Sequence, residues 1–276
     1  MKCLKKHITF LNYIVIKSEY MFKFLKLYDV GYKKIRVGPK EDGGYVLLKE
    51  PSKNTKNLLS FGVEDNIDFE IDFNKKFKPN KISLFDHTVN KLPKKTKFSF
   101  IKKGLSDKKN NKFETLKSIS KNFDNNNILK MDIEFDEWKI FENIEIETLI
   151  KFKQIICEFH LFFLEKKDVD SEKKLTPYFK NFSINNYEKI NKMLMQRYEI
   201  VFKKLNKYFT PYHLSANNSL PLKKLFGKNF PQLIEISLVR NDLINKKKFY
   251  KGKLPIKNLD FANKTYKSDL KKFYPF

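Results

Sequence analysis

The 276-residue chain contains very little cysteine. Its two cysteines, Cys3 and Cys157, are far apart in the sequence and provide neither a disulfide framework nor the spacing of a zinc site. Cys157 lies in the apolar run QIICEF, which is typical of a small buried hydrophobic residue. This cysteine usage is typical of a reducing compartment, and we therefore predict a cytoplasmic protein.

Long apolar runs are also lacking. The apolar patch at residues 8–16 is interrupted by Asn12, and it is shorter than the roughly 20 residues that a membrane span needs. No convincing small-residue cleavage site follows it. We expect no membrane span, and we expect residues 1–30 to form an N-terminal extension.

Glycine is scarce, with eight residues in the chain, and no GxGxxG motif is present. Dinucleotide-binding folds use these glycines to bring the backbone close to a pyrophosphate. The absence of the motif argues against an oxidoreductase on such a fold.

Arginine is rare although the formal net charge is +25. Almost all the positive charge is lysine, whereas base readout and bidentate phosphate binding favour arginine. We interpret most of the charge as solvated lysine, and we do not expect a nucleic-acid partner. The alternative is a Lys-rich nucleic-acid or membrane-surface binding protein on a non-catalytic Rossmann-like fold. It predicts that binding of such a partner depends steeply on salt concentration.

Short apolar runs alternate with helical patterns from Asn57 onward. This alternation predicts an α/β fold with a doubly wound, Rossmann-like, seven-stranded and mostly parallel sheet that has helices on both faces. A single domain is expected over residues 31–245, followed by a basic aromatic C-terminal tail over 246–276. The expected strands are 57–62, 81–86, 97–104, 128–132, 153–160, 208–214 and 232–239, and the longest expected helix is 186–205.

Residues at the ends of the first three strands are candidate ligand contacts, because doubly wound sheets bind ligands at the carboxyl ends of their strands. Gly62 allows a close approach of the backbone. Asp86, 24 residues after Gly62, is placed to accept hydrogen bonds from a ribose diol. Asp107 can accept from an adenine amino group. Each also fits an ordinary turn or helix cap.

Acidic residues cluster after the fourth expected strand. Asp132 and Glu134 alternate along extended chain and can face one cleft. Acids crowded in a cleft require a cation or raised pKa values. Asp136 and Glu137 are expected only to favour the N-terminus of the following helix.

The fifth strand end adds Glu158 and His160, which share a face by the same alternation. His160 and His213 are two of four histidines, and both fall at expected strand ends. Either can serve as a general base for a hydroxyl, or as a metal ligand with Asp132 and Glu158. A surface or hydrogen-bonded core histidine is the simpler interpretation.

Taken together, the motifs resemble FkbM-like methyltransferases. They are RVGPKEDGGYVLL, LLSFGVEDNIDFE, ISLFDHTV, KGLSD, LKMDIEFDEW and CEFH. The resemblance runs from Arg36 to His160, with a looser similarity at YHLSANN and IEISLVR. It implies S-adenosylmethionine as cofactor and a class I methyltransferase fold.

The resemblance also assigns roles to individual residues. It places Gly62 and Glu64 on the loop that holds the methionine part of the cofactor, Asp86 at the ribose and Asp107 at the adenine side. It matches Asp132 and Glu134 to the family's D-x-E element. The family commonly has glycine after that glutamate, where this chain has Phe135. An upstream element that covers the cofactor includes Gly44 and Tyr45, with Arg36 near a carboxylate.

The expected activity is an S-adenosylmethionine-dependent methyl transfer, with O-methylation of a sugar or other small hydroxyl acceptor, such as a surface polysaccharide precursor. His160 or Glu158 is the expected base, with His213 as a second candidate. A divalent cation such as Mg²⁺ on Asp132 and Glu158 can instead lower the pKa of the hydroxyl. The N/D-P-P-Y element of many nucleobase amine methyltransferases is absent. The sequence gives no indication of oligomeric state.

Overall fold

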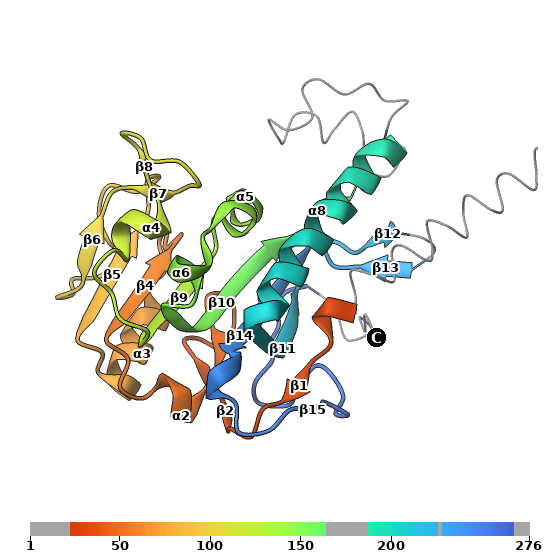
Figure 1. Cartoon of the computed structure of the whole chain (residues 1–276), viewed down its shortest axis with the longest axis horizontal. Coiled ribbons are helices and arrows are strands. Elements are labelled where there is room, and N and C mark those ends of the chain that lie inside the picture. The colour runs from red at the N-terminus through yellow and green to blue at the C-terminus, as the bar shows by residue number, and fades with distance from the viewer. Residues whose placement is uncertain (1–22, 164–186, 226–227, 268–276) are drawn as a thin grey trace, which may run out of the picture.

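The computed structural model describes residues 23–163, 187–225 and 228–267 (Figure 1). Residues 1–22 of the expected N-terminal extension and 268–276 of the expected tail lie outside this part of the chain. Within the described ranges, no helix combines the length and apolar character that a membrane span requires.

A seven-stranded sheet forms the centre of the fold, with the order β11-β14-β10-β9-β4-β5-β6 (Figure 1). Neighbours from β10 to β6 pair in parallel, whereas β14 pairs antiparallel with both β10 and β11. The α/β class and the mostly parallel seven-stranded sheet are thus confirmed. The strands are β4 (Asn57–Phe61), β5 (Lys81–Phe85), β6 (Ser99–Ile101), β9 (Asn127–Met131), β10 (Phe152–His160), β11 (Phe209–Asn217) and β14 (Leu233–Arg240).

The strand register brings the candidate residues to one edge of the sheet. Phe61 at the end of β4 pairs with Phe85 of β5 and with Met131 of β9. Met131 in turn pairs with Cys157 of β10. The residues that follow Phe61, Phe85 and Met131 therefore leave the sheet side by side, next to Glu158 and His160 on the last residues of β10.

Successive residues of the central strands belong to two different hydrophobic clusters. Leu59 belongs to a cluster that includes residues of α5 (Asp136–Asn143) and α8 (Tyr187–Tyr208). Leu58 belongs to another, which includes residues of α3 (Asp68–Phe77). Each fully buried large apolar side chain contributes about 1.5–3 kcal/mol. The two clusters therefore hold helices and sheet together.

The longest helix, α8, packs against α5 and β11 (Figure 1). The helix expected at 186–205 is confirmed as Tyr187–Tyr208. Met193 is 49% exposed. The 3.6-residue period places Met195, Tyr198 and Phe202 on the buried face of the helix.

The third expected strand, 97–104, was too long. Its sheet pairing is confined to β6, and β7 (Gly104–Leu105) forms a separate parallel pair with β8 (Phe113–Glu114). The Lys103 N–H donates to the Ile101 carbonyl at 2.7 Å, which marks a turn between the two strands.

Smaller elements surround the sheet. Two hairpins are β2 (Lys34–Val37) with β3 (Tyr45–Leu48), and β12 (Lys223–Leu225) with β13 (Lys228–Phe230). Near the chain ends, β1 (Tyr28–Asp29) pairs with β15 (Lys248–Phe249), which ties the two flanking segments together. The division at residues 30 and 245 stays a prediction. The remaining short helices are η1 (Lys23–Leu25), α2 (Lys49–Ser52), α4 (Leu116–Ile119), α6 (Ile146–Leu149) and η4 (Asn241–Leu243).

Candidate active site

A cavity of about 770 Å³ lies at the carboxyl ends of β4, β5, β9 and β10. Its wall includes the residues that follow these strands, part of the β2–β3 hairpin, and residues 263–266 near the C-terminus. Cavities of this size accommodate a small cofactor together with part of an acceptor. The cavity therefore occupies the place where a doubly wound sheet binds ligands.

Gly62 begins the loop after β4 and is required there by geometry. Its φ of +71° is in the left-handed region, and a Cβ atom on it would overlap the backbone oxygen of Asp132. The Gly62 N–H donates to the Phe85 carbonyl at 3.0 Å, and Lys130 Nζ donates to the Gly62 carbonyl at 2.9 Å. The loop is thus fixed against the ends of the two neighbouring strands, β5 and β9.

Asp86 follows β5 and supports the same loop from the other side. Its Oδ2 accepts from the N–H groups of Val63 and Glu64 at 3.1 and 3.0 Å. Its Oδ1 accepts from the N–H and the hydroxyl of Thr88 at 2.7 and 2.6 Å. Burial opposes the charge, but these hydrogen bonds outweigh it and lower the pKa of Asp86. The carboxylate is therefore ionised and positions the loop.

Asp132 follows β9 and is contacted by the β2–β3 hairpin. The Tyr45 hydroxyl donates to Asp132 Oδ2 at 3.2 Å, so the upstream element reaches the cavity through this tyrosine. Burial raises the pKa of Asp132. Glu64, on the loop after β4, also lines the cavity, and burial together with Asp132 raises its pKa.

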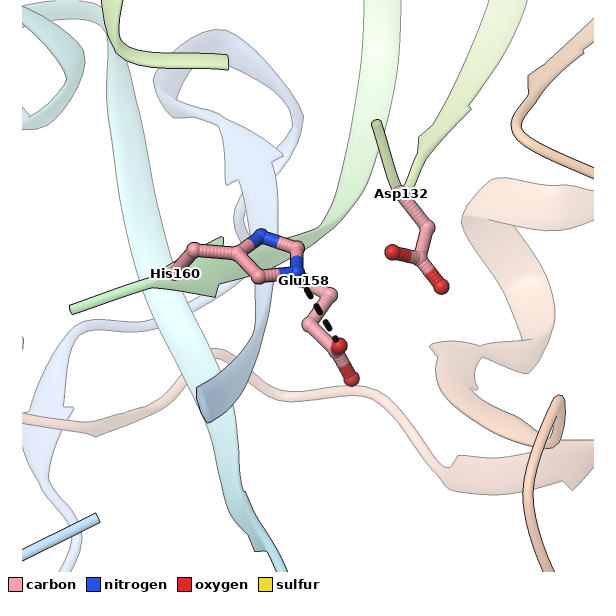
Figure 2. A group of neighbouring side chains, drawn as sticks. All are labelled: Asp132, Glu158 and His160. Atoms are coloured by element: carbon pink, nitrogen blue, oxygen red, sulfur yellow. Dashed lines mark ion pairs between the residues drawn. The ribbon is translucent and has the colours of Figure 1, made fainter. Parts of the chain in front are cut away.

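The side chains of Glu158 and His160 extend from the last residues of strand β10 on the side where Asp132 lies, as Figure 2 shows. Glu158 Oε1 lies 3.8 Å from His160 Nε2, and Glu158 Oε2 accepts from Asn217 Nδ2 at 2.7 Å. One ligand atom each of Asp132, Glu158 and His160 falls within 4.8 Å of the others. The expected cluster at the fourth and fifth strand ends is therefore present in the fold.

Glu137 is a further member of this cluster that the sequence did not reveal. It is fully buried, and its Oε1 accepts from the His160 backbone N–H at 2.8 Å and lies 3.1 Å from His160 Nδ1. The available indication was its position on α5, because Glu137 shares an inward face with Ile140 and Phe141 at helical spacing. A carboxylate on that face needs a polar partner, and His160 provides it.

The charge state of His160 follows from these neighbours. Burial disfavours the imidazolium, but Glu137 and Glu134 outweigh burial and raise the pKa of His160 well above its usual value. Glu134 Oε2 is 3.3 Å from Nε2, and this glutamate is 75% exposed. Burial and the charge of Asp132 raise the pKa of Glu158 well above its usual value. The pKa values of His160 and Glu158 are therefore both shifted upward, by the neighbouring acids at His160 and by burial at Glu158.

The D-x-E element continues in an unusual backbone conformation. Glu134 and Phe135 have φ values of +51° and +77°. Left-handed backbone costs a side-chain-bearing residue about 1–2 kcal/mol, which explains why glycine suits the position after the glutamate. Here the Phe135 ring packs 4.9 Å from His160 and 5.6 Å from Phe162 between ring centroids. The contacts offset part of the backbone cost.

His213 and Asp107 are not among the residues that line the cavity. His213 is buried in the middle of β11, where its Nε2 lies 2.7 Å from Asp260 Oδ1. Asp107 accepts from Asn143 Nδ2 at 3.1 Å, on the outside of the β7–α5 region. The structure therefore places neither the candidate base His213 nor the candidate adenine contact Asp107 in the wall of this cavity.

Arg36 and Gly44 belong to the β2–β3 hairpin and also lie outside the cavity lining. Arg36 donates to the carbonyl groups of Pro39, Glu41 and Leu259 at 2.6–2.9 Å. A Cβ on Gly44 would overlap the Pro39 carbonyl. Both residues therefore stabilise the connection between β2 and β3, and Tyr45 at the start of β3 lines the cavity.

The cavity wall is acidic although the chain as a whole is strongly basic. Of the lysines in the wall, Lys130 bonds to the Gly62 carbonyl and Lys264 Nζ lies 3.4 Å from Asp42. Such a wall repels phosphate groups and suits cationic or neutral ligands. The carboxylates are Glu41, Asp42, Glu64, Asp65, Asp86, Asp132, Glu134, Asp136 and Glu158.

Comparisons with known proteins leave the family open. No protein-family model matches the chain, and no curated protein matches it significantly. Among solved structures, the plantazolicin methyltransferase BpumL in complex with SAH is similar over 68% of this chain and 77% of that chain, with 11% identity and a TM-score of 0.31. At this TM-score the similarity carries no conclusion about function. Membership of the FkbM-like family is not confirmed and stays a prediction.

Proposed function

We propose that this chain is an S-adenosylmethionine-dependent methyltransferase that methylates a hydroxyl group of a sugar or other small acceptor. The observation that carries the proposal is the meeting of Gly62, Asp86, Asp132 and the Glu158–His160 pair in one cavity. The strand order supports it, because these residues follow or end neighbouring parallel strands, where open α/β sheets bind their ligands.

The cavity offers a contact for each part of the cofactor. The loop from Gly62 to Glu64, which Asp86 holds in place, suits the methionine part and the ribose. Each carboxylate oxygen of Asp86 already accepts two hydrogen bonds. A ribose hydroxyl that binds Asp86 must therefore share Oδ1 with Thr88 or replace Thr88 as its donor. We place the adenine against Leu105 and Phe113, which line the cavity near the end of β5.

The proposed chemistry needs little from the protein besides position and proton removal. S-adenosylmethionine supplies a methyl group on a positively charged sulfur, which the acidic wall favours. The acceptor hydroxyl lies beside Glu158 Oε1 and His160 Nε2. The member of this pair that is unprotonated takes the proton of the hydroxyl, or the two atoms hold a cation that lowers the pKa of the hydroxyl. The phosphate-repelling wall disfavours the alternative of nucleic acid at this site.

The test is calorimetric titration of the full chain with S-adenosylhomocysteine. We expect saturable binding to the unaltered chain and at least 100-fold weaker binding to Asp86→Ala, because the Val63–Glu64 loop loses its anchor. Asp107→Ala is the matched control, since this acid also follows a strand but lies outside the cavity, and its affinity should stay within about threefold. Absence of binding to the unaltered chain, or equal losses in the two variants, would overturn the proposal.

A further inference from the structure

The three neighbouring residues in Figure 2 are of side-chain types that bind metal ions. Asp132 comes from the end of β9, and Glu158 and His160 come from the adjacent end of β10. One ligand atom of each lies within 4.8 Å of the others, which a small movement would bring onto a common ion. Two carboxylates and an imidazole suit a divalent first-row ion such as Mn²⁺ better than Mg²⁺, which prefers oxygen ligands alone.

A second observation distinguishes the site from a chance group of acids: each candidate ligand is held through its other polar atom. Glu137 Oε1 lies 3.1 Å from His160 Nδ1. Asn217 Nδ2 donates to Glu158 Oε2 at 2.7 Å, and the Tyr45 hydroxyl donates to Asp132 Oδ2 at 3.2 Å. Histidines that bind metals nearly always donate their other ring N–H to such a partner.

Glu158 and His160 are buried, whereas Asp132 is half-buried at the cavity wall. The side chains of Glu158 and His160 are 7% and 4% exposed. Within the described residues, neither Glu158 Oε1 nor Asp132 Oδ1 has a hydrogen-bond donor in contact, and the nearby Lys130 Nζ is directed at the Gly62 carbonyl. Carboxylate oxygens crowded in this way are stabilised by a positive charge, and Lys130 and His160 already act on Asp132 in this sense.

We propose that Asp132, Glu158 and His160 bind one divalent transition-metal ion, oriented by Glu137, Asn217 and Tyr45, with open positions that face the cavity. Three protein ligands with open positions are typical of a catalytic rather than a structural site. Its use in binding the oxygen atoms of a hydroxyl acceptor rests on the proposed function, whereas binding of the ion does not. An ion with open coordination positions favours an acceptor that offers two neighbouring oxygen atoms, such as a vicinal diol.

The experiment is titration of Mn²⁺ into the full chain after chelator treatment, without S-adenosylmethionine, with free Mn²⁺ followed by electron paramagnetic resonance. We expect one site, lost or weakened at least 100-fold in His160→Gln and Glu158→Gln. Glu137→Gln should weaken binding about 10–100-fold, as loss of an orienting partner does. His213→Gln and Asp260→Asn are the matched controls, because they alter a second buried histidine–carboxylate pair, and their affinity should stay within about threefold.

A second readout keeps the test independent of folding defects. Bound Mn²⁺ should show electron spin-echo modulation from an imidazole nitrogen, and this modulation should vanish in His160→Gln but persist in His213→Gln. Absence of Mn²⁺ binding to the unaltered chain, or persistence of the nitrogen signal in His160→Gln, would overturn the proposal. Titration with S-adenosylhomocysteine on the same samples separates this failure from a failure of the proposed function.

Discussion

His160 and His213 lie on strands of the same sheet, and both are buried beside a carboxylate. His160 Nδ1 is 3.1 Å from Glu137, and His213 Nε2 is 2.7 Å from Asp260. The difference lies in the other ring nitrogen. His160 Nε2 faces Glu134 and Glu158 at the cavity, whereas His213 Nδ1 is buried without a hydrogen-bond partner among the described residues.

The electrostatic consequence has opposite signs at the two histidines. Burial lowers the pKa of His213, and its partner Asp260 compensates only in part. Burial acts in the same direction at His160, but Glu137 and Glu134 outweigh it and raise the pKa. A carboxylate partner is thus not enough to identify a functional histidine. The number of acids around the ring, and the direction of its second nitrogen, distinguish the two.

The largest expected effect is on turnover. His160→Gln should lower methyl transfer from labelled S-adenosylmethionine at least 100-fold, because loss of an acceptor-activating group costs about 10²–10⁴-fold. His213→Gln should stay within about fivefold, since His213 lies outside the cavity. Both rates are measured with an acceptor that the unaltered chain methylates. Equal losses would remove the distinction between the two histidines.

A second prediction concerns the pH dependence of stability. The raised pKa of His160 means that the folded state binds the extra proton, so this contribution is present below about pH 6.5 and is lost as pH rises through the folded-state pKa. The lowered pKa of His213 has the opposite effect: its contribution is lost as pH falls through about 6.5 toward the folded-state pKa. For each histidine, the free energy of unfolding changes by at most about 1.4 kcal/mol per pH unit.

The measurement is urea unfolding of the unaltered chain, His160→Gln and His213→Gln between about pH 5 and 9. The stability difference between the unaltered chain and His160→Gln should shrink with rising pH, and the difference for His213→Gln should shrink with falling pH. Two differences that change in the same direction would contradict the assignment of opposite charge states.

The smallest expected effect is at Phe135, which packs on His160 and has no counterpart at His213. Phe135→Gly relieves left-handed backbone strain of about 1–2 kcal/mol but removes the ring contacts with His160 and Phe162. The free energy of unfolding should therefore change by less than about 1 kcal/mol. Urea unfolding measures it, and a loss above about 2 kcal/mol would mean that the ring is an essential part of the core.

Much of the fold was predictable because buried strands and amphipathic helices have local signatures. The runs that became β4, β5, β9 and β10 were each located to within one residue at their ends. Strand order is not a local property, so the insertion of β14 between β10 and β11 could not be derived from its sequence.

Part of the candidate site was also predictable from local sequence patterns. Asp132, Glu158 and His160 come together because they end adjacent parallel strands, which the sequence pattern indicated. Glu137 and Asn217 contact them from other elements, through packing that no local pattern specifies. His213 looked equivalent to His160 in the sequence because strand alternation does not show which strand end opens into a cavity.

The most direct test of the central claim is a crystal structure of the full chain with S-adenosylhomocysteine. The account predicts the ligand in the cavity, with its ribose beside Asp86 and its sulfur facing the side that carries Glu158 and His160. A ligand bound outside this cavity, or no ligand density after soaking at millimolar concentration, would contradict it.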